Sequence, residues 1–506
     1  MTEEIKEIRT SSQEKDNKSS YRSIFKATSL FGGVQIYDII IGIIKTKCVA
    51  VILGPAGMGI QGLLHSGTDL IRTLTSFGLS ASAVRDVSEA NGTGDINRIG
   101  KTVAVLRRLV WVTGIIGMVA TIGFSPVLSK TLFGNYDYTV SFILLSVILL
   151  FTQLSNGQKV VLQGMRKLQY MAKSTAIGAT LGLLVTVPLY YLFGVKGIVP
   201  TLILQSVTTL CLSWYFSSKV SIKKVKVTNK EAYEGGKSML KMGIAMSISG
   251  ILSSAIAYLI RGYLGRTGGV GEVGLYTSGF TLMNTYVGMV FTAMGTDYYP
   301  RLSAVNKDND KCRNVINQQA EIATLIMGPL VLSCILFMPL IVQILYSKDF
   351  LPATDFILWG VLGLVFKASS WSISYIFLAK AESTLFIINE TVTSVTHLIL
   401  QMFGYKYFGL TGLGIAYTLN YLIYFVQVYI IAKLRYNFTF SKPFIKVYIV
   451  QLGLVSTAYI IGKIWSGPAI TVILVILLIV SFIYSLHEMD LRMDMLSLLK
   501  KRVKKN

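Results

Sequence analysis

Long apolar stretches alternate with short polar segments along almost the whole chain. Fourteen of these stretches reach about 20 residues, the length that an α-helix needs to cross the ~30 Å hydrocarbon core of a bilayer. Glycine, proline or charged residues bound them, as is typical of helix ends and loops. The predicted spans are 24–45, 57–83, 104–126, 139–159, 173–194, 197–217, 242–262, 273–298, 319–346, 355–379, 384–405, 410–432, 443–462 and 468–486.

Basic residues fall mainly in every second loop of this arrangement. The chain has 48 Lys and Arg residues against 25 Asp and Glu, a formal net charge of +23. Because cytoplasmic loops hold most of the Lys and Arg of a membrane protein, the alternation predicts that both termini are cytoplasmic. Only 14% of the residues are charged and 52% are hydrophobic, which excludes an ordinary soluble domain and a nucleic-acid-binding protein. Five basic residues among the last seven are suited to contact anionic membrane lipids.

An internal repeat accompanies the predicted spans. The chain reads LGPAGMGIQGLLHSG after the first span and LGRTGGVGEVGLYTSG after the seventh, so that Gly59 aligns with Gly274. The equivalent places of the two segments predict two six-helix lobes related by the repeat, followed by an accessory helix pair. The predicted organisation is a cytoplasmic tail at 1–22, a first lobe at 23–218, a basic cytoplasmic linker at 219–241, a second lobe at 242–433, the helix pair at 443–486 and a basic tail at 487–506.

One segment of the repeat resembles a nucleotide-binding loop. Gly57, Gly59 and Gly62 satisfy the pattern G-x-G-x-x-G. A dinucleotide-binding loop belongs to a soluble βαβ unit, whereas this segment lies between two predicted membrane spans. We therefore interpret the glycines as residues that let helices approach closely. The four cysteines lack the spacing of a metal site, so we expect neither a cofactor nor a metal.

Ionisable side chains inside the predicted spans are the main functional candidates, because a charge in the hydrocarbon region is costly and normally faces a cavity or a partner. Three are cations that suit an anion such as a diphosphate, since Arg binds phosphate bidentately and Lys as a point charge. The predicted substrate-binding residues are Arg72, Arg261 and Lys367. The carboxylates are candidates for binding H⁺ or Na⁺ that couples transport to an ion gradient, namely Asp38, Asp69, Asp297 and Glu390.

Several of these residues have a structural alternative. Asp69 and Arg72 are three residues apart and share a helix face, which also predicts an ion pair. Arg261 and Asp297 lie near the ends of their spans, where a charged side chain can reach the membrane surface. A further buried candidate, His397, is interpreted as a packing residue rather than a proton relay. Lys367 is the best centred, with about ten residues of its span on either side.

The residues at the start of the chain resemble those of a known family. SIFKATSLFGGVQIYDIIIGIIKTKCVAVILGPAGMGIQGLLHSGTDLIRTLTSFGLSASAVRD is similar to the beginning of O-antigen translocases, the polysaccharide flippases of the multidrug/oligosaccharidyl-lipid/polysaccharide exporter superfamily. The LGPAGMGIQGLL turn, the six-plus-six repeat and the C-terminal helix pair fit this family. The resemblance implies a central cavity, alternating access, and an undecaprenyl-diphosphate-linked oligosaccharide that crosses the inner membrane. It also implies a polysaccharide polymerase and a chain-length regulator as partners.

Three other functions remain open from the sequence. A multidrug antiporter of the same superfamily favours acidic and aromatic cavity walls, whereas the candidates in this chain include three cations. A lipid II flippase shares the diphosphate chemistry and the fourteen spans. An integral membrane polymerase or acyltransferase usually needs a sizeable extramembrane loop or an intramembrane His/Asp group, and the predicted extracytoplasmic loops are short. We therefore expect a transporter rather than an enzyme.

Overall fold

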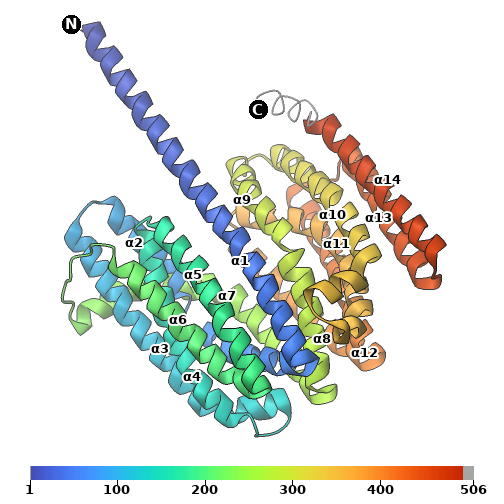
Figure 1. Ribbon diagram of the computed structural model, residues 1–506. Helices are drawn as coiled ribbons and strands as arrows, with labels where there is room; N and C mark the ends of the chain where they lie inside the picture. Colours follow the sequence, from blue (N-terminus) through green and yellow to red (C-terminus); the bar gives the residue numbers. More distant parts are fainter. Residues whose placement is uncertain (1, 494–506) are drawn as a thin grey trace. The chain divides into compact units, whose positions relative to one another are not determined.

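The computed structural model describes residues 2–493, which form helices joined by short connections, as the predicted all-α class requires. The helices in Figure 1 are α1 Thr2–Thr75, α2 Leu79–Gly92, α3 Ile96–Phe133, α4 Thr139–Gly164, α5 Leu168–Phe193, α6 Ile198–Ser218, α7 Asn229–Thr267, α8 Gly269–Thr281, α9 Met289–Ala304, α10 Asn309–Leu345, α11 Thr354–Ala379, α12 Ser383–Tyr436, α13 Lys442–Ile464 and α14 Pro468–Met493. From residue 494 onwards, the predicted basic tail at 487–506 lies outside the described residues.

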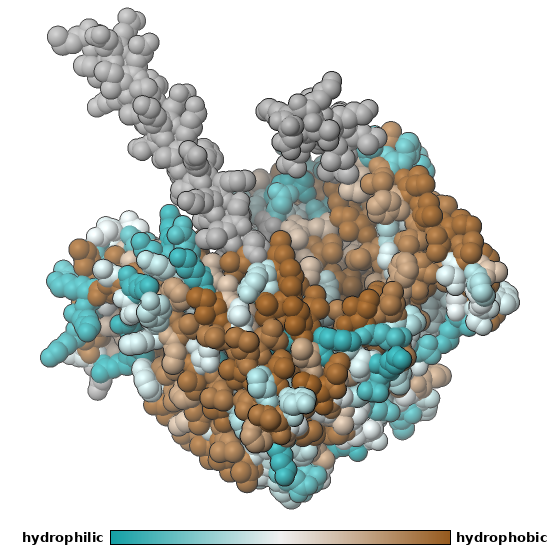
Figure 2. Space-filling model, viewed as in Figure 1, coloured by the Kyte–Doolittle hydropathy of each residue, from teal (hydrophilic) through white to brown (hydrophobic). Residues whose placement is uncertain are grey.

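Helices of the described residues expose apolar side chains as helices in lipid do. Ten helical segments within residues 2–493 are long and apolar enough to cross a membrane. On α3, large apolar side chains recur at helical spacing on an exposed face, namely Trp111, Ile115, Val119 and Ile122. Apolar side chains cover much of the visible surface (Figure 2). The chain is a multi-pass membrane protein, and some of its ten segments contain more than one predicted span, such as Leu168–Ser218.

Two of the longest helices are interrupted by a glycine. The 74-residue helix α1 breaks at Gly54, whose backbone has φ 62° and ψ −173°, and Pro55 follows directly. The 54-residue helix α12 breaks in the same way at Gly409, with φ 58° and ψ −143°. Glycine adopts a positive φ at little cost because it has no Cβ. Each break therefore lets two helical stretches follow each other without a connecting loop.

The described chain divides into two compact units. Unit 1 comprises Met1–Leu53 and Leu63–Ser254, and unit 2 comprises Gly54–Gly62 and Ala255–Asn506. In unit 1, α4 packs against α3 and α6, and buried side chains that include Leu79, Val103 and Val161 join α2 to α3 and α4. In unit 2, α11 packs against both α10 and α12. The short segment 54–62 thus belongs to a different unit from the rest of α1.

The aligned glycines of the internal repeat pack directly against each other within unit 2. A Cβ added to Gly59 would lie 1.7 Å from the carbonyl oxygen of Val270 and 3.0 Å from the backbone nitrogen of Gly274. A Cβ added to Gly274 would lie 1.9 Å from the carbonyl oxygen of Pro55. Backbone atoms at this distance leave no room for any side chain. The G-x-G-x-x-G segment therefore serves helix packing, as the sequence indicated.

The predicted span at 273–298 is not a single α-helix. Helix α8 ends at Thr281, a π-helical turn follows at Leu282–Tyr286, and α9 begins at Met289. Gly288 lies where a Cβ would be 1.9 Å from the carbonyl oxygen of Asn284, which explains the glycine at the end of this turn. Single π-helical turns inside helices are rare and frequently accompany functional sites.

A group of charged residues joins the C-terminal helices to α10. Helices α13 and α14 pack against each other and against α10 (Figure 1). Arg492 Nε donates to Glu321 Oε2 at 2.6 Å, and its Nη1 donates to Glu488 Oε2 at 2.5 Å. Glu488 Oε1 also accepts from Lys446 Nζ at 3.1 Å. The Glu321 and Glu488 side chains are 9% and 6% exposed, so each buried carboxylate has a cationic partner.

The connection between α6 and α7 in unit 1 ends in a helix cap. Glu231 Oε2 accepts from the backbone N–H and the hydroxyl of Thr228, both at 2.9 Å, in the reciprocal arrangement of a capping box. Lys101 Nζ donates to Glu231 Oε1 at 2.8 Å. The hydrogen bond from Lys101, followed by those from Thr228, lowers the pKa of the Glu231 carboxyl to about 2. The ionised carboxylate thus fixes the start of α7 at Asn229.

Candidate functional site

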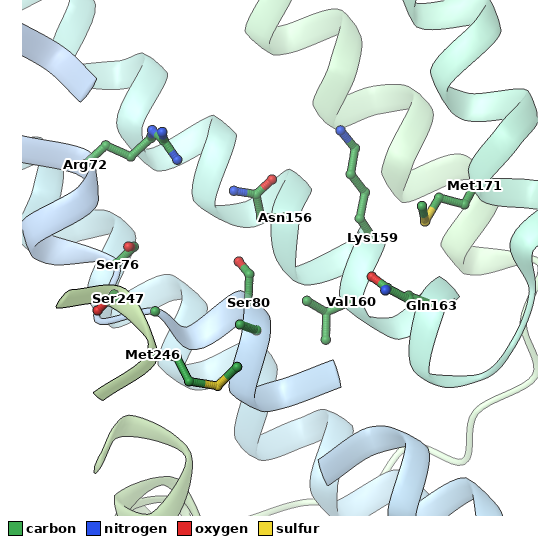
Figure 3. Close-up of a pocket in the computed structure, with 12 residues that line it drawn as sticks. Arg72, Ser76, Ser80, Asn156, Lys159, Val160, Gln163, Met171, Met246 and Ser247 are labelled. Carbon is green, nitrogen blue, oxygen red and sulfur yellow. The ribbon is translucent and has the colours of Figure 1, made fainter. Parts of the chain in front are cut away.

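A polar cavity lies inside unit 1, between the end of α1, the start of α2 and helices α4, α5 and α7. Its volume is about 420 Å³. Arg72 comes from α1 and Lys159 from α4, and Asn156 lies between them (Figure 3). The polar residues that line the cavity are Arg72, Ser76, Ser80, Asn156, Lys159, Gln163 and Ser247. The cavity combines two cations with neutral hydrogen-bonding groups.

One wall of the cavity is a polar stripe on α4. Asn156, Lys159 and Gln163 are three and four residues apart, so they share one face of the helix. The predicted span at 139–159 places Lys159 at its last position, next to a loop. Helix α4 instead continues to Gly164, so Lys159 lies well inside it. The three-and-four spacing of polar residues was the signal in the sequence that identifies this face.

Arg72 is paired with Asp69 on the same helix. Arg72 Nε donates to Asp69 Oδ1 at 3.0 Å, and its Nη2 contacts the same oxygen. The two side chains are 36% and 33% exposed, so the pair borders open space. A guanidinium has five N–H donors, and a pair that uses one carboxylate oxygen leaves donors for a second anionic group. Arg72 is therefore equipped to bind an anion in the cavity.

Asp38 interacts with two lysines of unit 1, one of which is Lys159 of the cavity. It interacts electrostatically with Lys45 on its own helix and with Lys159 on α4. Lys45 Nζ also donates to Gln205 Oε1 on α6 at 3.0 Å. The two cations of the cavity thus each have a carboxylate nearby, which is Asp69 for Arg72 and Asp38 for Lys159. Both carboxylates are ion-coupling candidates of the sequence.

Lys367 lies in a polar network of unit 2. Its Nζ donates to Asn284 Oδ1 at 3.1 Å, and the Tyr417 hydroxyl donates to the same oxygen at 3.0 Å. Asn284 belongs to the π-helical turn Leu282–Tyr286. The Lys367 ammonium also lies 5.0 Å from the centre of the Tyr421 ring, within the range of a cation–π interaction. A neutral amide and an aromatic ring hold this charge in place.

Glu390 lies on α12, the helix that also contacts Lys367 through Tyr421. The Tyr424 hydroxyl donates to Glu390 Oε1 at 3.0 Å, and Tyr424 is three residues from Tyr421 on α12. The neighbouring Asn389 is buried and accepts from Gln427 Nε2 at 2.5 Å. Glu390 and Lys367 are thus each positioned by a tyrosine of α12. Tyr421, beside the cation, and Tyr424, beside the carboxylate, lie three residues apart on α12.

The remaining candidates of unit 2 have other surroundings. Arg261 is half-buried on α7 and interacts electrostatically with Tyr276 of α8. Asp297 is exposed on α9 and pairs with Arg301 one turn away, with 3.3 Å between Oδ2 and Nε. The structure groups the predicted residues by unit, with Asp38, Asp69 and Arg72 in unit 1 and Arg261, Asp297, Lys367 and Glu390 in unit 2.

Comparison with known sequences identifies related proteins. Residues 48–355 match the model of a family described as polysaccharide biosynthesis protein. The lipid III flippase of Escherichia coli (strain K12) is 20% identical over 405 residues, which cover 80% of this chain and 96% of that protein. The lipid III flippase of Shigella flexneri matches with the same identity and coverage.

Solved structures share the fold. An inward-facing multidrug resistance MATE family transporter of the MOP superfamily matches with a TM-score of 0.69 at 17% identity, covering 79% of this chain and 94% of that one. The lipid II flippase MurJ in an inward closed conformation matches with a TM-score of 0.65 at 16% identity, covering 90% of this chain and 97% of that one. The chain shares the fold of these two proteins.

Proposed function

We propose that this chain, which belongs to the polysaccharide biosynthesis protein family, is a flippase for undecaprenyl-diphosphate-linked oligosaccharide in the cell inner membrane. The headgroup is an O-antigen or related polysaccharide repeat unit, and transport proceeds by alternating access. Relatives named lipid III flippases and a fold shared with the lipid II flippase MurJ support a lipid-linked saccharide as substrate. A polysaccharide polymerase and a chain-length regulator are the partners we expect in the same membrane.

The cavity of unit 1 is the observation that carries this proposal. It places Arg72 and Lys159 beside five neutral polar side chains in helices that otherwise expose apolar faces. A diphosphate presents several negatively charged oxygens, which suit a guanidinium that binds bidentately and an ammonium that acts as a point charge. The amide and hydroxyl groups of the lining suit sugar hydroxyls. An uncharged lipid or an organic cation would leave both cations without a ligand.

The carboxylates near these cations provide a means of releasing the substrate. Asp69 pairs with Arg72, and Asp38 interacts electrostatically with Lys159. We propose that the diphosphate displaces Asp69 from Arg72, so that the freed carboxylate binds H⁺ or Na⁺. Loss of that cation would restore the ion pair and expel the diphosphate. Asp297 and Glu390 are the corresponding ion-coupling candidates of unit 2.

Unit 2 contributes the other two cations of the proposed binding set. Lys367 is held by Asn284 and Tyr421, which keeps its ammonium in one place. Arg261 is half-buried on α7. We propose that both contact the diphosphate during the transport cycle, while the sugars occupy hydrated space and the polyprenyl chain remains in lipid.

The proposed topology has fourteen membrane passes with both termini in the cytoplasm. Leu168–Ser218 contains helices α5 and α6, and α12 is divided at Gly409, which supports two passes for each of these long segments. The proposed organisation has six-helix lobes at 23–218 and 242–433, joined by the basic linker and followed by the helix pair at 443–486. The location of Lys and Arg in alternate loops supports this orientation.

Two related functions make different predictions about the ligand. A multidrug antiporter would transport organic cations, which the cationic lining of the unit 1 cavity disfavours. A lipid II flippase would use the same diphosphate contacts, and only the sugars of the headgroup distinguish it from the proposed function. Transport of lipid-linked oligosaccharides with different sugars therefore separates these two flippases.

The test is a flipping assay with the full-length protein in liposomes. The substrate is undecaprenyl diphosphate that carries a labelled oligosaccharide, and transfer is scored by access of a membrane-impermeant lectin. Arg72→Ala and Lys159→Ala should each lower the initial rate by about tenfold or more, because each removes a charge-assisted hydrogen bond to the diphosphate. Arg261→Ala and Lys367→Ala should abolish complementation of a flippase-deficient strain.

A matched control separates the loss of a contact with the diphosphate from the loss of a positive charge elsewhere in the unit. Lys173→Met removes an exposed lysine of α5 in the same unit and should leave the rate unchanged. Wild-type rates for Arg72→Ala and Lys159→Ala would contradict the role of the cavity. Failure of the wild-type protein to move any lipid-linked oligosaccharide, together with drug resistance on overexpression, would favour the antiporter.

A further inference from the structure

A second cavity lies within unit 2, between α9 and α11, and aromatic rings form most of its walls. Its volume is about 450 Å³. Helix α9 contributes Phe291, Thr292, Gly295 and Tyr299, and α11 contributes Trp371 and Tyr375. None of these residues was a candidate of the sequence analysis. The cavity thus offers an aromatic surface with hydroxyl groups at several positions.

Ring contacts fix the walls of this cavity. The Trp371 ring centre lies 4.9 Å from that of Tyr375 and 5.6 Å from that of Phe291, and the ring planes are tilted by 59° and 55°. Tyr299 meets Tyr375 edge to face with 6.1 Å between the ring centres. Aromatic pairs at these distances stabilise each other, so the rings form a preorganised surface. A ligand would find the walls already in place.

A cation lies at one end of this aromatic surface. Lys367 precedes Trp371 by one helical turn on α11, and its Nζ lies 5.6 Å from the centre of the Phe291 ring. The hydrogen bond to Asn284 Oδ1 keeps the ammonium at this end. The rings of the cavity therefore begin where the positive charge is, and they continue along α11 to Tyr375.

We propose that this aromatic cavity binds a pyranose ring of the headgroup, with the diphosphate directed toward Lys367. The proposal rests on the flippase function proposed above. A pyranose has an apolar C–H face that packs on the electron-rich face of an aromatic ring, and its hydroxyl edge suits the hydroxyls of Thr292, Tyr299 and Tyr375. In a glycosyl diphosphate the anion is bonded directly to the first sugar, which matches a cation beside aromatic rings. A polyprenyl chain is apolar and would form no favourable polar interaction with the cation or the hydroxyls.

Gly295 keeps this cavity open. A Cβ added to Gly295 would lie 3.2 Å from the Tyr375 hydroxyl oxygen and 3.3 Å from Trp371 Cζ2. A methyl group would already be tight there, and a longer side chain would fill the space in front of both rings. Gly295→Leu therefore blocks the cavity without removing a ring. It complements Trp371→Leu, which removes the ring and its contacts with Phe291.

The experiment compares two probes on the full-length protein in lipid nanodiscs. One is undecaprenyl diphosphate alone, and the other is the same lipid carrying a disaccharide of hexose and N-acetylhexosamine. The wild-type protein should bind the glycosylated probe about tenfold more tightly than the bare lipid, the gain expected from stacking on a fixed ring. Trp371→Leu and Gly295→Leu should both lose this difference while they keep the wild-type Kd for undecaprenyl diphosphate.

The control is Trp359→Leu, another tryptophan of α11, which packs on Tyr459 of α13 with 4.9 Å between ring centres. It should bind both probes as the wild type does. If Trp371→Leu and Gly295→Leu weaken both probes equally, the cavity holds the polyprenyl chain and the sugar proposal is wrong. Equal wild-type affinity for the two probes also overturns it, whereas the flippase function stands. If the wild type binds neither probe, both proposals fail.

Discussion

Replacing Arg492 by methionine should lower the free energy of unfolding by about 3 kcal/mol. Methionine keeps part of the apolar length but cannot donate to Glu321 and Glu488, whose side chains are 9% and 6% exposed. Removing one partner of a buried ion pair costs roughly 3–5 kcal/mol, because the other charge stays buried without compensation. We expect the lower end, because Arg492 is itself 23% exposed and Lys446 still pairs with Glu488.

The assay is reversible unfolding of the purified protein in mixed micelles. Arg98→Met is the matched control, because Arg98 and Glu89 form a 2.6 Å pair whose side chains are 50% and 57% exposed. An exposed pair of this kind contributes roughly 0–1 kcal/mol. Adding Glu321→Gln to Arg492→Met should recover part of the loss, since a neutral amide is less costly to bury. Equal midpoints for Arg492→Met and Arg98→Met would refute the reasoning.

Three further predictions follow from contacts within single units. Gly274→Val should sharply reduce the yield of folded protein in size-exclusion chromatography, whereas Gly271→Val, where a Cβ meets nothing within 4 Å, should not. The stability of the wild type should fall as the pH drops from about 5 toward 2, because the Glu231 carboxyl has a pKa of about 2 when folded and a higher one when unfolded. Glu231→Gln should flatten the thermal unfolding profile over that range, and an unchanged slope would refute this. Asn284→Leu removes the acceptor of Lys367 and should lower the flipping rate by about tenfold or more, so wild-type rates would argue against this network.

Local rules in the sequence predicted the features that depend on few residues. The spacing of Asp69 and Arg72 predicted their ion pair, because side chains three apart meet on one helix face. The repeat predicted close helix packing at its glycines, and Gly59 and Gly274 do pack together. Apolar length and charge distribution were sufficient for the all-helical membrane class. Each of these inferences depends only on residues within one or two helical turns, or on the similarity of two segments of the sequence.

Other features depend on partners far along the chain. Lys159 was missed because hydropathy falls before the helix ends, and α4 continues past it to Gly164. Asn284 was missed because a neutral amide in an apolar run carries no charge signal, and its partner Lys367 lies 83 residues later. The aromatic cavity was missed because Trp371 and Tyr375 resemble ordinary packing residues until α9 is placed beside them. These three features can be recognised only when the contacts between helices are known, because the local sequence pattern does not identify the partner residues.

Segment 54–62 is synthesised long before the rest of unit 2, to which it belongs. The segment packs against α8 of unit 2, yet roughly 210 residues separate Gly59 from Val270 along the chain, which take about 10–40 s to translate. During this interval the glycine face of the segment has no partner from α8. Lipid or the insertion machinery must cover it until α8 emerges. The emergence of Val270 and Gly274 thus sets the earliest moment at which segment 54–62 can pack into the second unit.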